Sequence, residues 1–519
     1  MPGESGGLRR AFMAVAAGLA ALLGGCTVGP DYVKPEAPVP AAYKEAWKPG
    51  PLEKGWQRAR PNETIDRGAW WSIYHDPILD GLERQIDISN QNLKAAAAAF
   101  REAEATVTAA RAQFFPTGRL SGSATRSRSS GNSAPQAGFG GGIQNQFLAE
   151  TTVSWVPDLW GSVRRLVESD VANAQASAAT LANARLAAQA QLATAYVELR
   201  VADELTRLLQ ASVKAYTQAL QITRNQLKGG TTDQSAVDQA QAQLDATRAQ
   251  LIAVGVTRGQ LEHSIAVLIG KPPAELTIAP ITAMLSVPMI PSDLPSALLQ
   301  RRPDIAASER DMHAANALIG VDTAAFYPTV TLSADTGVEA EMFRKLFTEP
   351  SRIWSIGSSA AETIFDGGAR NAQIAHDEAA YDASVATYRQ AVLTGLQQVE
   401  DELVAERVLA EEAVAEDSAV KAARQAEATI HNQYLAGTQA YTAVIVAENT
   451  ALADEESAVN IRQSRLVASV ALIEALGGGW DASQLPSRDQ IESDQPLNFN
   501  PLPPTFPNEG AGITPPLPK

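Results

Sequence analysis

Cysteine and histidine are scarce in this sequence, and their scarcity excludes several kinds of functional site. The 519 residues include one cysteine, Cys26, and five histidines, which are scattered without metal-ligand spacing. A single cysteine cannot form an intramolecular disulfide or a cysteine-based metal cluster. The sequence also contains no nucleophile elbow and no phosphate-binding loop. We therefore expect a protein that is not an enzyme and that holds no metal and no cofactor.

Positive charge is also in short supply. Lys and Arg total 42 against 58 for Asp and Glu, which gives a formal net charge of −16. Coating nucleic acid requires clustered positive charge, so we expect no nucleic-acid partner. Hydrophobic residues make up 45% and charged residues 19% of the chain, a composition typical of a folded protein.

The N-terminal apolar run is too short to cross a bilayer comfortably as a helix. Residues 11–23 are 13 uncharged residues that follow two arginines, whereas a spanning helix needs about 20. This length suits the core of a signal peptide. The run ends in Leu-Gly-Gly-Cys, which resembles a bacterial lipobox and predicts a signal peptide over 1–25 and lipidation at Cys26. An ordinary signal peptide with a chance cysteine is the alternative. An aspartate directly after the cysteine would resemble an inner-membrane retention signal, so Thr27 at this position favours the outer membrane.

The chain contains an internal duplication. AQFFPT at 112–117 recurs as AAFYPT at 324–329, an offset of 212, and NQLKGGT at 225–231 recurs as NQYLAGT at 432–438, an offset of 207. The difference predicts a five-residue deletion after Thr329 in the second copy. We expect six segments: a signal peptide (1–25), an N-terminal lipidated segment (26–76), a first repeat (77–275), a linker (276–293), a second repeat (294–480) and a proline-rich tail (481–519).

Glycine and proline are nearly missing from two long stretches. Residues 162–228 contain neither, and residues 369–436 contain only Gly395. Both stretches are rich in strong helix formers, and a helix of 67 residues reaches roughly 100 Å. Beyond the second stretch, apolar residues recur by sevens, which predicts a coiled-coil seam: Ile445, Leu452, Val459, Leu466 and Ile473. This periodicity alone also fits a soluble coiled-coil rod.

Period-two segments argue against the rod. Apolar and polar residues alternate over 147–155 and 330–335, and more weakly over 117–127 and 353–364. Each repeat therefore reads as a helix, two strands, a long helix, a turn and a long helix. The strands have about the 9–11 residues that a tilted strand needs to cross a membrane. Four ordinary soluble strands are the alternative.

Aromatic residues stand immediately before two of the strands, where a membrane-interface girdle would lie: Phe114, Phe115, Phe326 and Tyr327. Four strands cannot close a barrel, and lipid does not tolerate an open sheet edge. If these strands span a membrane, the protein must oligomerise. Three protomers would supply twelve strands and a tube of twelve helices.

Five motifs together resemble the TolC/OprM family of outer-membrane efflux channels, in its lipoprotein (NodT-type) branch. They are GCTVGPDYVKP (25–35), WWSIYHDPILDGL (70–82), DLWG (158–161), the stretch 294–337 with its QRRPDIAASERD core, and FDGG (365–368). The resemblance implies a mainly α fold with a membrane β-barrel. Long α-helical hairpins would form an α-barrel, and four strands per internally duplicated protomer would close, in a homotrimer, as a 12-stranded β-barrel.

The same resemblance implies a function and partners. The protein would be a passive exit duct for small molecules across the periplasm and outer membrane, lipid-anchored in the outer membrane. An inner-membrane pump of the RND type and a periplasmic adaptor, or membrane fusion protein, would deliver the cargo. A channel exporting polypeptides, as in type I secretion, is the alternative.

The resemblance also implies which turns matter. Turns 227–233 and 434–441 would form the periplasmic tip, with adaptor contacts at Gly230, Thr231, Thr232, Gly437, Thr438 and Gln439. In relatives, carboxylates shortly after the second turn ring the aperture, but residues 442–446 read Thr-Ala-Val-Ile-Val. We hypothesise a neutral or apolar constriction involving Tyr434, Thr442 and Val446. Asp238 is the nearest remaining acidic candidate.

The resemblance also implies a mixed equatorial belt around the α-barrel, and two further expectations concern this belt. Arg301 and Arg302 either pair with acids of this belt or stay solvated. Eight prolines follow Gln495, so from Ser487 onward we expect an extended or disordered tail. This tail is either solvated or wrapped around the belt.

Overall fold

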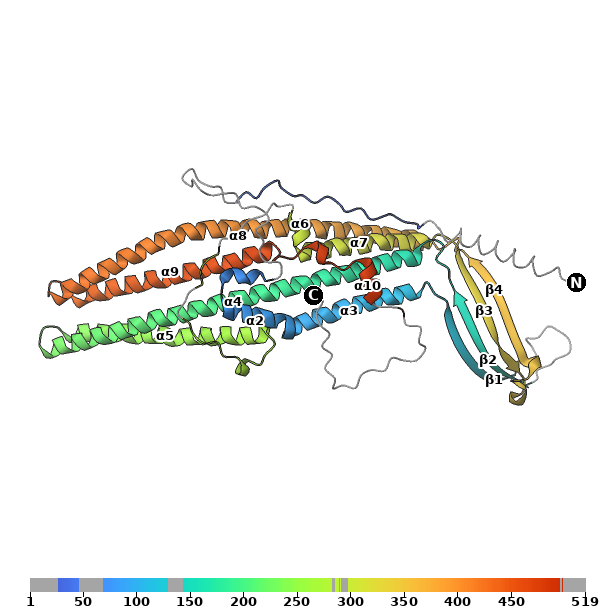
Figure 1. The fold of residues 1–519 in the computed structure, drawn as a ribbon, viewed down its shortest axis with the longest axis horizontal. Helices are drawn as coiled ribbons and strands as arrows, with labels where there is room; N and C mark the ends of the chain where they lie inside the picture. Colours follow the sequence, from blue (N-terminus) through green and yellow to red (C-terminus); the bar gives the residue numbers. More distant parts are fainter. Residues whose placement is uncertain are drawn as a thin grey trace.

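The computed structural model describes residues 27–45, 69–128, 143–281, 285–288, 290, 297–494 and 497. The expected signal peptide, Cys26 and residues 495, 496 and 498–519 of the proline-rich tail lie outside these residues. Within them the chain is elongated, with paired long helices along the body and a curved sheet at one end (Figure 1). Among the described residues, no helix combines the length and the apolar composition that a membrane-spanning helix needs.

The elements follow one another twice in the same order. The first half contains η1 (Trp70–Tyr74), α2 (Pro77–Ser89), α3 (Gln91–Ala112), β1 (Thr117–Arg128), β2 (Ile143–Trp155), α4 (Ser162–Lys228), α5 (Gln234–Leu268) and η2 (Pro273–Glu275). The second half contains α6 (Leu298–Arg301), α7 (Pro303–Ala324), β3 (Thr329–Ala340), η4 (Phe343–Lys345), η5 (Glu349–Ser351), β4 (Arg352–Ala361), α8 (Ala369–Leu435), α9 (Tyr441–Ala475), η6 (Ala482–Gln484) and α10 (Arg488–Asp494). The predicted mainly helical, duplicated fold is confirmed.

The two long helices begin at the same kind of turn. Asp158 accepts hydrogen bonds from the backbone N–H of Val163 at 3.1 Å and of Arg164 at 3.0 Å. In the second repeat, Asp366 accepts from the N–H of Gly368 at 2.9 Å and of Arg370 at 3.3 Å. A carboxylate at this position satisfies free N–H groups and favours the positive end of the helix. The DLWG and FDGG motifs therefore start α4 and α8.

Within the described residues, four strands form one antiparallel sheet in the order β1-β2-β3-β4. The register aligns Leu120, Thr151, Thr336 and Trp354 in one row, so alternate residues of all four strands share a face. One face is apolar over most of its length and includes Leu120, Phe147, Val153, Leu332, Val338, Trp354 and Ile356. The other face carries hydroxyl side chains and the charged residues Arg119, Glu150, Asp335 and Glu339. A sheet with this division does not belong to a helical rod.

The five-residue difference between the repeats lies in the sheet. β4 has 10 residues where β2 has 13, and the connection before β4 (341–351) is shorter than the one before β2 (129–142). α4 and α8 are both 67 residues long, and α5 and α9 are both 35. The shortening leaves the helical hairpins equal in length.

The repeats share a core near the middle of the body. Trp70, Tyr196 and Ile265 of the first half lie in one cluster with Val470 and Ile473 of α9. The indole N–H of Trp70 donates to Oε1 of Gln189 at 3.3 Å. The two repeats are therefore packed into one folded unit.

A buried ionic network ties the linker to the first hairpin. Asp203 accepts from Arg200 at 2.9 Å and from Arg258 at 2.7 Å. Arg200 also donates to the carbonyl of Ala279, and Arg258 donates to the carbonyl of Ile278. Val237, Leu244, Leu251 and Ile265 of α5 keep a seven-residue spacing in which position 258 would be apolar. The network explains why an arginine stands there instead.

The tail differs from expectation in one respect, and Arg302 follows one of its two alternatives, pairing with an acid. Residues 488–494 form α10 rather than an extended tail, because Ile491 is 1% exposed and packs in a cluster with Val107 and Val167. Arg302 is buried rather than solvated, but its acid partner is Asp304 on the neighbouring helix turn, at 2.6 Å. It also donates to the carbonyl of Ala475 at 3.0 Å.

Removing Asp203 should be far more costly than removing an exposed aspartate. Asp203→Asn leaves the guanidinium of Arg200, whose side chain is 2% exposed, without its counter-ion, and breaking a buried pair costs about 3–5 kcal/mol. Asp245→Asn breaks an equivalent i,i+3 pair with Arg248 on the surface, which costs at most about 1 kcal/mol. Thermal unfolding of both variants checks this. Equal losses would contradict a structural role for the network.

Candidate functional site at the helical hairpin turns

The two hairpin turns have the same backbone structure. In the first, the N–H of Gly230 bonds to the carbonyl of Leu227, and the N–H of Thr231 bonds to the carbonyl of Gln226, both at 3.0 Å. In the second, Gly437 and Thr438 make the corresponding bonds, both at 2.9 Å. This pattern is the Schellman motif, which needs a left-handed residue after the helix. Gly230 and Gly437 have φ values of 72° and 73°.

The threonine of each turn adds a side-chain bond. The hydroxyl of Thr231 donates to the carbonyl of Gln226 at 3.1 Å, and that of Thr438 donates to the carbonyl of Gln433 at 3.0 Å. The Gly-Thr pair therefore forms the same hydrogen-bonded turn in each of the two repeats. Gly230, Thr231, Gly437, Thr438 and Gln439 are exposed, and Thr232 is half-buried. They stand at the free ends of the hairpins, far from the sheet (Figure 1).

The turns differ in how the next helix begins. Asp233 caps α5 by accepting from the N–H of Ala236 at 3.1 Å. Ala440 occupies the equivalent place before α9 and makes no side-chain cap. Tyr441, the first residue of α9, is buried instead. The start of α9 is therefore stabilised by packing, whereas the start of α5 is stabilised by a side-chain cap.

Hydrogen bonds join the two hairpins close to their ends. The hydroxyl of Tyr434 on α8 donates to Oε1 of Gln226 on α4. Gln243 on α5 donates to Oδ1 of Asn449 on α9. Between these bonds lies a hydrophobic seam of Tyr216, Leu220, Val237, Ala240, Leu244, Tyr441, Val444 and Leu452, which we call the tip seam. The tip seam holds the two hairpins together.

The predicted aperture residues fall into two groups. Thr442 and Val446 lie one turn apart on α9, and both are exposed, Val446 by 66%. Tyr434 is half-buried in the bond across the hairpins. Asp238 lies exposed on α5 and accepts from Gln234 at 2.8 Å. Thr442 and Val446 are thus free to face other protomers, whereas Tyr434 is occupied within its own.

Glu448 is a residue of the tip that sequence reasoning did not single out. It is 8% exposed, and its Oε2 has no hydrogen-bond partner. Burial, reinforced by the negative charge of Glu427, raises the pKa of Glu448 to about 7. The available signal was its spacing, because Glu448 stands three residues after Ile445 and four before Leu452, on the apolar seam. Near neutral pH this carboxyl group is close to its midpoint of ionisation.

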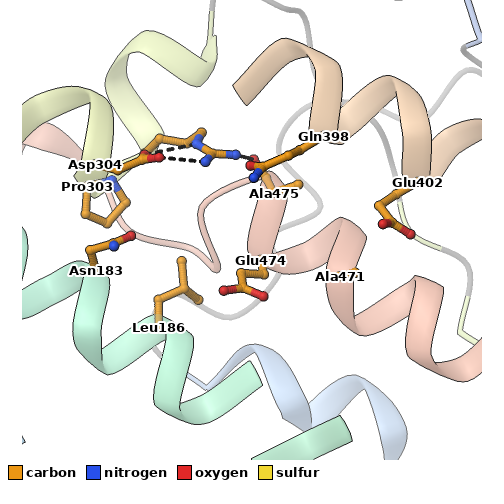
Figure 2. A pocket seen from close by; sticks show the side chains of 10 residues that line it. Asn183, Leu186, Pro303, Asp304, Gln398, Glu402, Ala471, Glu474 and Ala475 are labelled. Atoms are coloured by element: carbon orange, nitrogen blue, oxygen red, sulfur yellow. Dashed lines mark hydrogen bonds and ion pairs between the residues drawn. The ribbon is translucent and has the colours of Figure 1, made fainter. Parts of the chain in front are cut away.

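A cavity of about 310 Å³ lies between the repeats at the middle of the body. Figure 2 shows Asn183 and Leu186 of α4 facing Glu402 of α8 and Glu474 of α9 across it. Burial raises the pKa of both glutamates. Arg302 at its edge is already paired with Asp304. Among the described residues, no group of three His, Cys, Asp or Glu could hold a metal ion.

The stability of the tip should depend on pH through Glu448. Its folded pKa of about 7 lies above the ordinary 4.5, so the folded state binds the proton more tightly than the unfolded state does. The stabilisation from the protonated group is complete below pH 4.5 and is lost as the pH rises through 7. As the pH rises from 4.5 to 7, we expect the melting temperature of wild type to fall relative to that of the Glu448→Gln variant. Parallel curves would show that folding does not raise the pKa of Glu448.

Comparison with known proteins shows which family has this architecture. The sequence profile of the family described as outer membrane efflux protein matches residues 83–271 and 294–478. The probable efflux pump outer membrane protein TtgC of Pseudomonas putida is 30% identical over 465 residues, which cover 88% of this chain and 94% of that protein. The pyoverdine export outer membrane protein OpmQ of Pseudomonas aeruginosa is 28% identical over 449 residues, which cover 84% and 94%.

Solved structures agree. The outer-membrane channel OprN superposes with a TM-score of 0.78 at 29% identity, covering 88% of this chain and 100% of that one. The open-state outer membrane channel MtrE of Neisseria gonorrhoeae has a TM-score of 0.75 at 24% identity, covering 88% and 99%, and supports the fold. The family profile matches well over half of the sequence, in two segments that each contain a strand pair and a hairpin. This chain belongs to the outer membrane efflux protein family.

Proposed function

We propose that this chain is the outer-membrane channel of a tripartite efflux system, and that three copies close a passive exit duct for small molecules. The observation that carries the proposal is the two-faced sheet joined to long hairpins. An apolar face suits lipid, and the opposite face, with Arg119, Glu150, Asp335 and Glu339, suits a water-filled lumen. The long helices of both hairpins run away from the sheet (Figure 1), and in the proposed trimer they would extend the lumen away from the membrane.

Three copies supply what one protomer lacks. β1 and β4 are the edges of the sheet, and in lipid their backbone groups need partners from another chain. Three sheets of this size give twelve strands, within the range of known membrane barrels. The resemblance to the family also supports three copies and twelve strands.

Relatives support small molecules over polypeptides as the cargo. The names of relatives refer to toluene, antibiotic and solvent efflux pumps and to pyoverdine export. A pump component of this kind works with an inner-membrane pump, for which we propose the RND type, and with a periplasmic adaptor. The twin Gly-Thr turns offer the adaptor two similar rigid surfaces on each protomer. Transport, rather than catalysis, is the function we assign.

The position of the N-terminal segment supports lipidation at Cys26. The N–H of Val28 bonds to the carbonyl of Trp160 at 3.1 Å, and Arg165 forms an ion pair with Asp31 at 2.7 Å. These contacts hold the residues after Cys26 at the junction of β2 and α4, where the sheet meets the helices (Figure 1). Acyl chains on Cys26 would then enter the membrane beside the strands.

Export in cells tests the proposed function. In a strain lacking the gene, a fluorescent dye and antibiotics should accumulate, and the wild-type gene should restore their export. Cys26→Ser should fail to restore it, because the protein would lose its acyl anchor. A conservative substitution on the exposed surface of α5, Asp245→Asn, serves as the control and should restore export. Unchanged accumulation, with loss of a secreted polypeptide instead, would refute small-molecule export.

Single-channel recording tests the proposed constriction at Thr442 and Val446. We expect weak ion selectivity in wild type, because both side chains are uncharged. Val446→Asp should introduce cation selectivity, since three carboxylates would then ring the aperture. Strong cation selectivity in wild type that disappears in Asp238→Ala would move the filter to α5 and contradict the proposal.

A further inference from the structure

The charges on the apolar face of the sheet are all of one sign and all lie at one end. The register places Arg126, Arg128 and Arg352 on the same face as Leu120 and Trp354. No acidic residue of the four described strands lies on this face. The three arginines stand at the end of the sheet farthest from the helices. Acidic residues of the strands are confined to the opposite face, and the acid that pairs with Arg352, at 3.1 Å, is Glu349 in the connection before β4.

Aromatic side chains lie beside these arginines. Phe343, in the connection from β3 to β4, packs edge-to-face on Phe147 with ring centroids 5.8 Å apart. Phe147 belongs to the apolar face, so this connection leans toward that side of the sheet. Phe347 is 77% exposed. The connection is held in shape by the buried side chain of Leu346 and by the hydroxyl of Ser351, which donates to the carbonyl of Lys345 at 2.8 Å.

Strand length places this end of the sheet at a membrane surface. β3 has 12 residues, which at about 3.3 Å per residue and a tilt of about 40° rise roughly 30 Å. This matches the thickness of the hydrocarbon core, about 30 Å. Phe326 and Tyr327 precede β3 at its helical end. Arg128 stands eleven residues from the helical end of its strand, and Arg126 and Arg352 stand nine residues from theirs. Their long side chains therefore reach the headgroups of the opposite leaflet.

We propose that Arg126, Arg128 and Arg352, together with Phe343 and Phe347, form a lipid-binding rim for the phosphate groups of anionic lipids in the outer leaflet. The inference rests on the proposed function, because it requires the sheet to lie in the outer membrane with its apolar face toward lipid. Guanidinium groups bind phosphate with paired hydrogen bonds. Phenylalanine rings enter the acyl region beside them.

The proposed trimer would make this rim continuous. The arginines of β1 and β4 stand on the two edge strands, which pair with each other across protomers when the barrel closes. Arg352 of one protomer would then stand on the strand next to the one that carries Arg126 and Arg128 of the next protomer. Each junction would offer several guanidinium groups to one bisphosphorylated headgroup.

Binding of lipid A to the full-length trimer in neutral detergent tests the rim. Wild type should bind bisphosphorylated lipid A, and neither dephosphorylated lipid A nor inorganic phosphate should displace it. The variant Arg126→Gln/Arg128→Gln/Arg352→Gln should bind at least about tenfold more weakly, because losing one charge-assisted hydrogen bond costs this much. Replacing the same three residues with Lys should restore only part of the binding, because lysine keeps the positive charge but cannot make the paired hydrogen bonds.

A matched control removes three positive charges elsewhere. Arg119→Gln lies on the opposite face of β1, and Arg207→Gln and Arg248→Gln lie on exposed helix surfaces. This variant should bind lipid A as wild type does. Equal binding by the rim variant, or equal binding of phosphorylated and dephosphorylated lipid A by wild type, would overturn the inference. Displacement by inorganic phosphate would also overturn it, by indicating a simple anion site.

Two further readouts keep the outcomes distinct. If the rim variant does not assemble, the comparison of the two lipid A forms on wild type alone decides the question. Channel conductance is measured on the same preparations. A wild-type trimer that conducts ions but ignores the lipid phosphates refutes only the rim, whereas a protein that never conducts refutes the proposed function.

Discussion

A sheet of four strands in the order β1-β2-β3-β4 has two edges, and each edge presents a row of backbone N–H and C=O groups without sheet partners. In water these groups bind solvent, but hydrocarbon offers them no partner, so an open sheet is not stable there. The apolar face, from Leu120 to Trp354, nevertheless requires lipid or an equivalent cover. Closure with other copies satisfies both demands, and the long hairpins then become the wall of a tube.

Duplication makes that wall regular. Each repeat builds a 67-residue helix from a carboxylate-capped start and ends it in the same Schellman turn. The five residues missing from the second repeat come out of the strands and their connection, where length affects only the outer end. The two repeats differ in their buried polar side chains. Asp203 organises a buried network in the first repeat, whereas Glu448 in α9 of the second has a buried Oε2 without a hydrogen-bond partner.

Much of this fold could be read from the sequence, because it depends on local properties. The absence of glycine and proline defined α4 over 162–228, and the alternation over 147–155 defined the two faces of β2. Features that depend on distant partners could not be read. Burial of Ile491 needs α3 and α4 beside it, and the unpartnered state of Glu448 needs a second hairpin. The arginine rim needs the register of four strands, since no single strand shows that all three arginines share a face.

The most direct test of this account is the mass of the detergent-solubilised protein, corrected for bound detergent by sedimentation or native mass spectrometry. The full chain has a mass of 54.9 kDa, and the account predicts three chains per particle. A stable monomer or dimer would contradict it, because neither closes the edges of β1 and β4 into the proposed barrel.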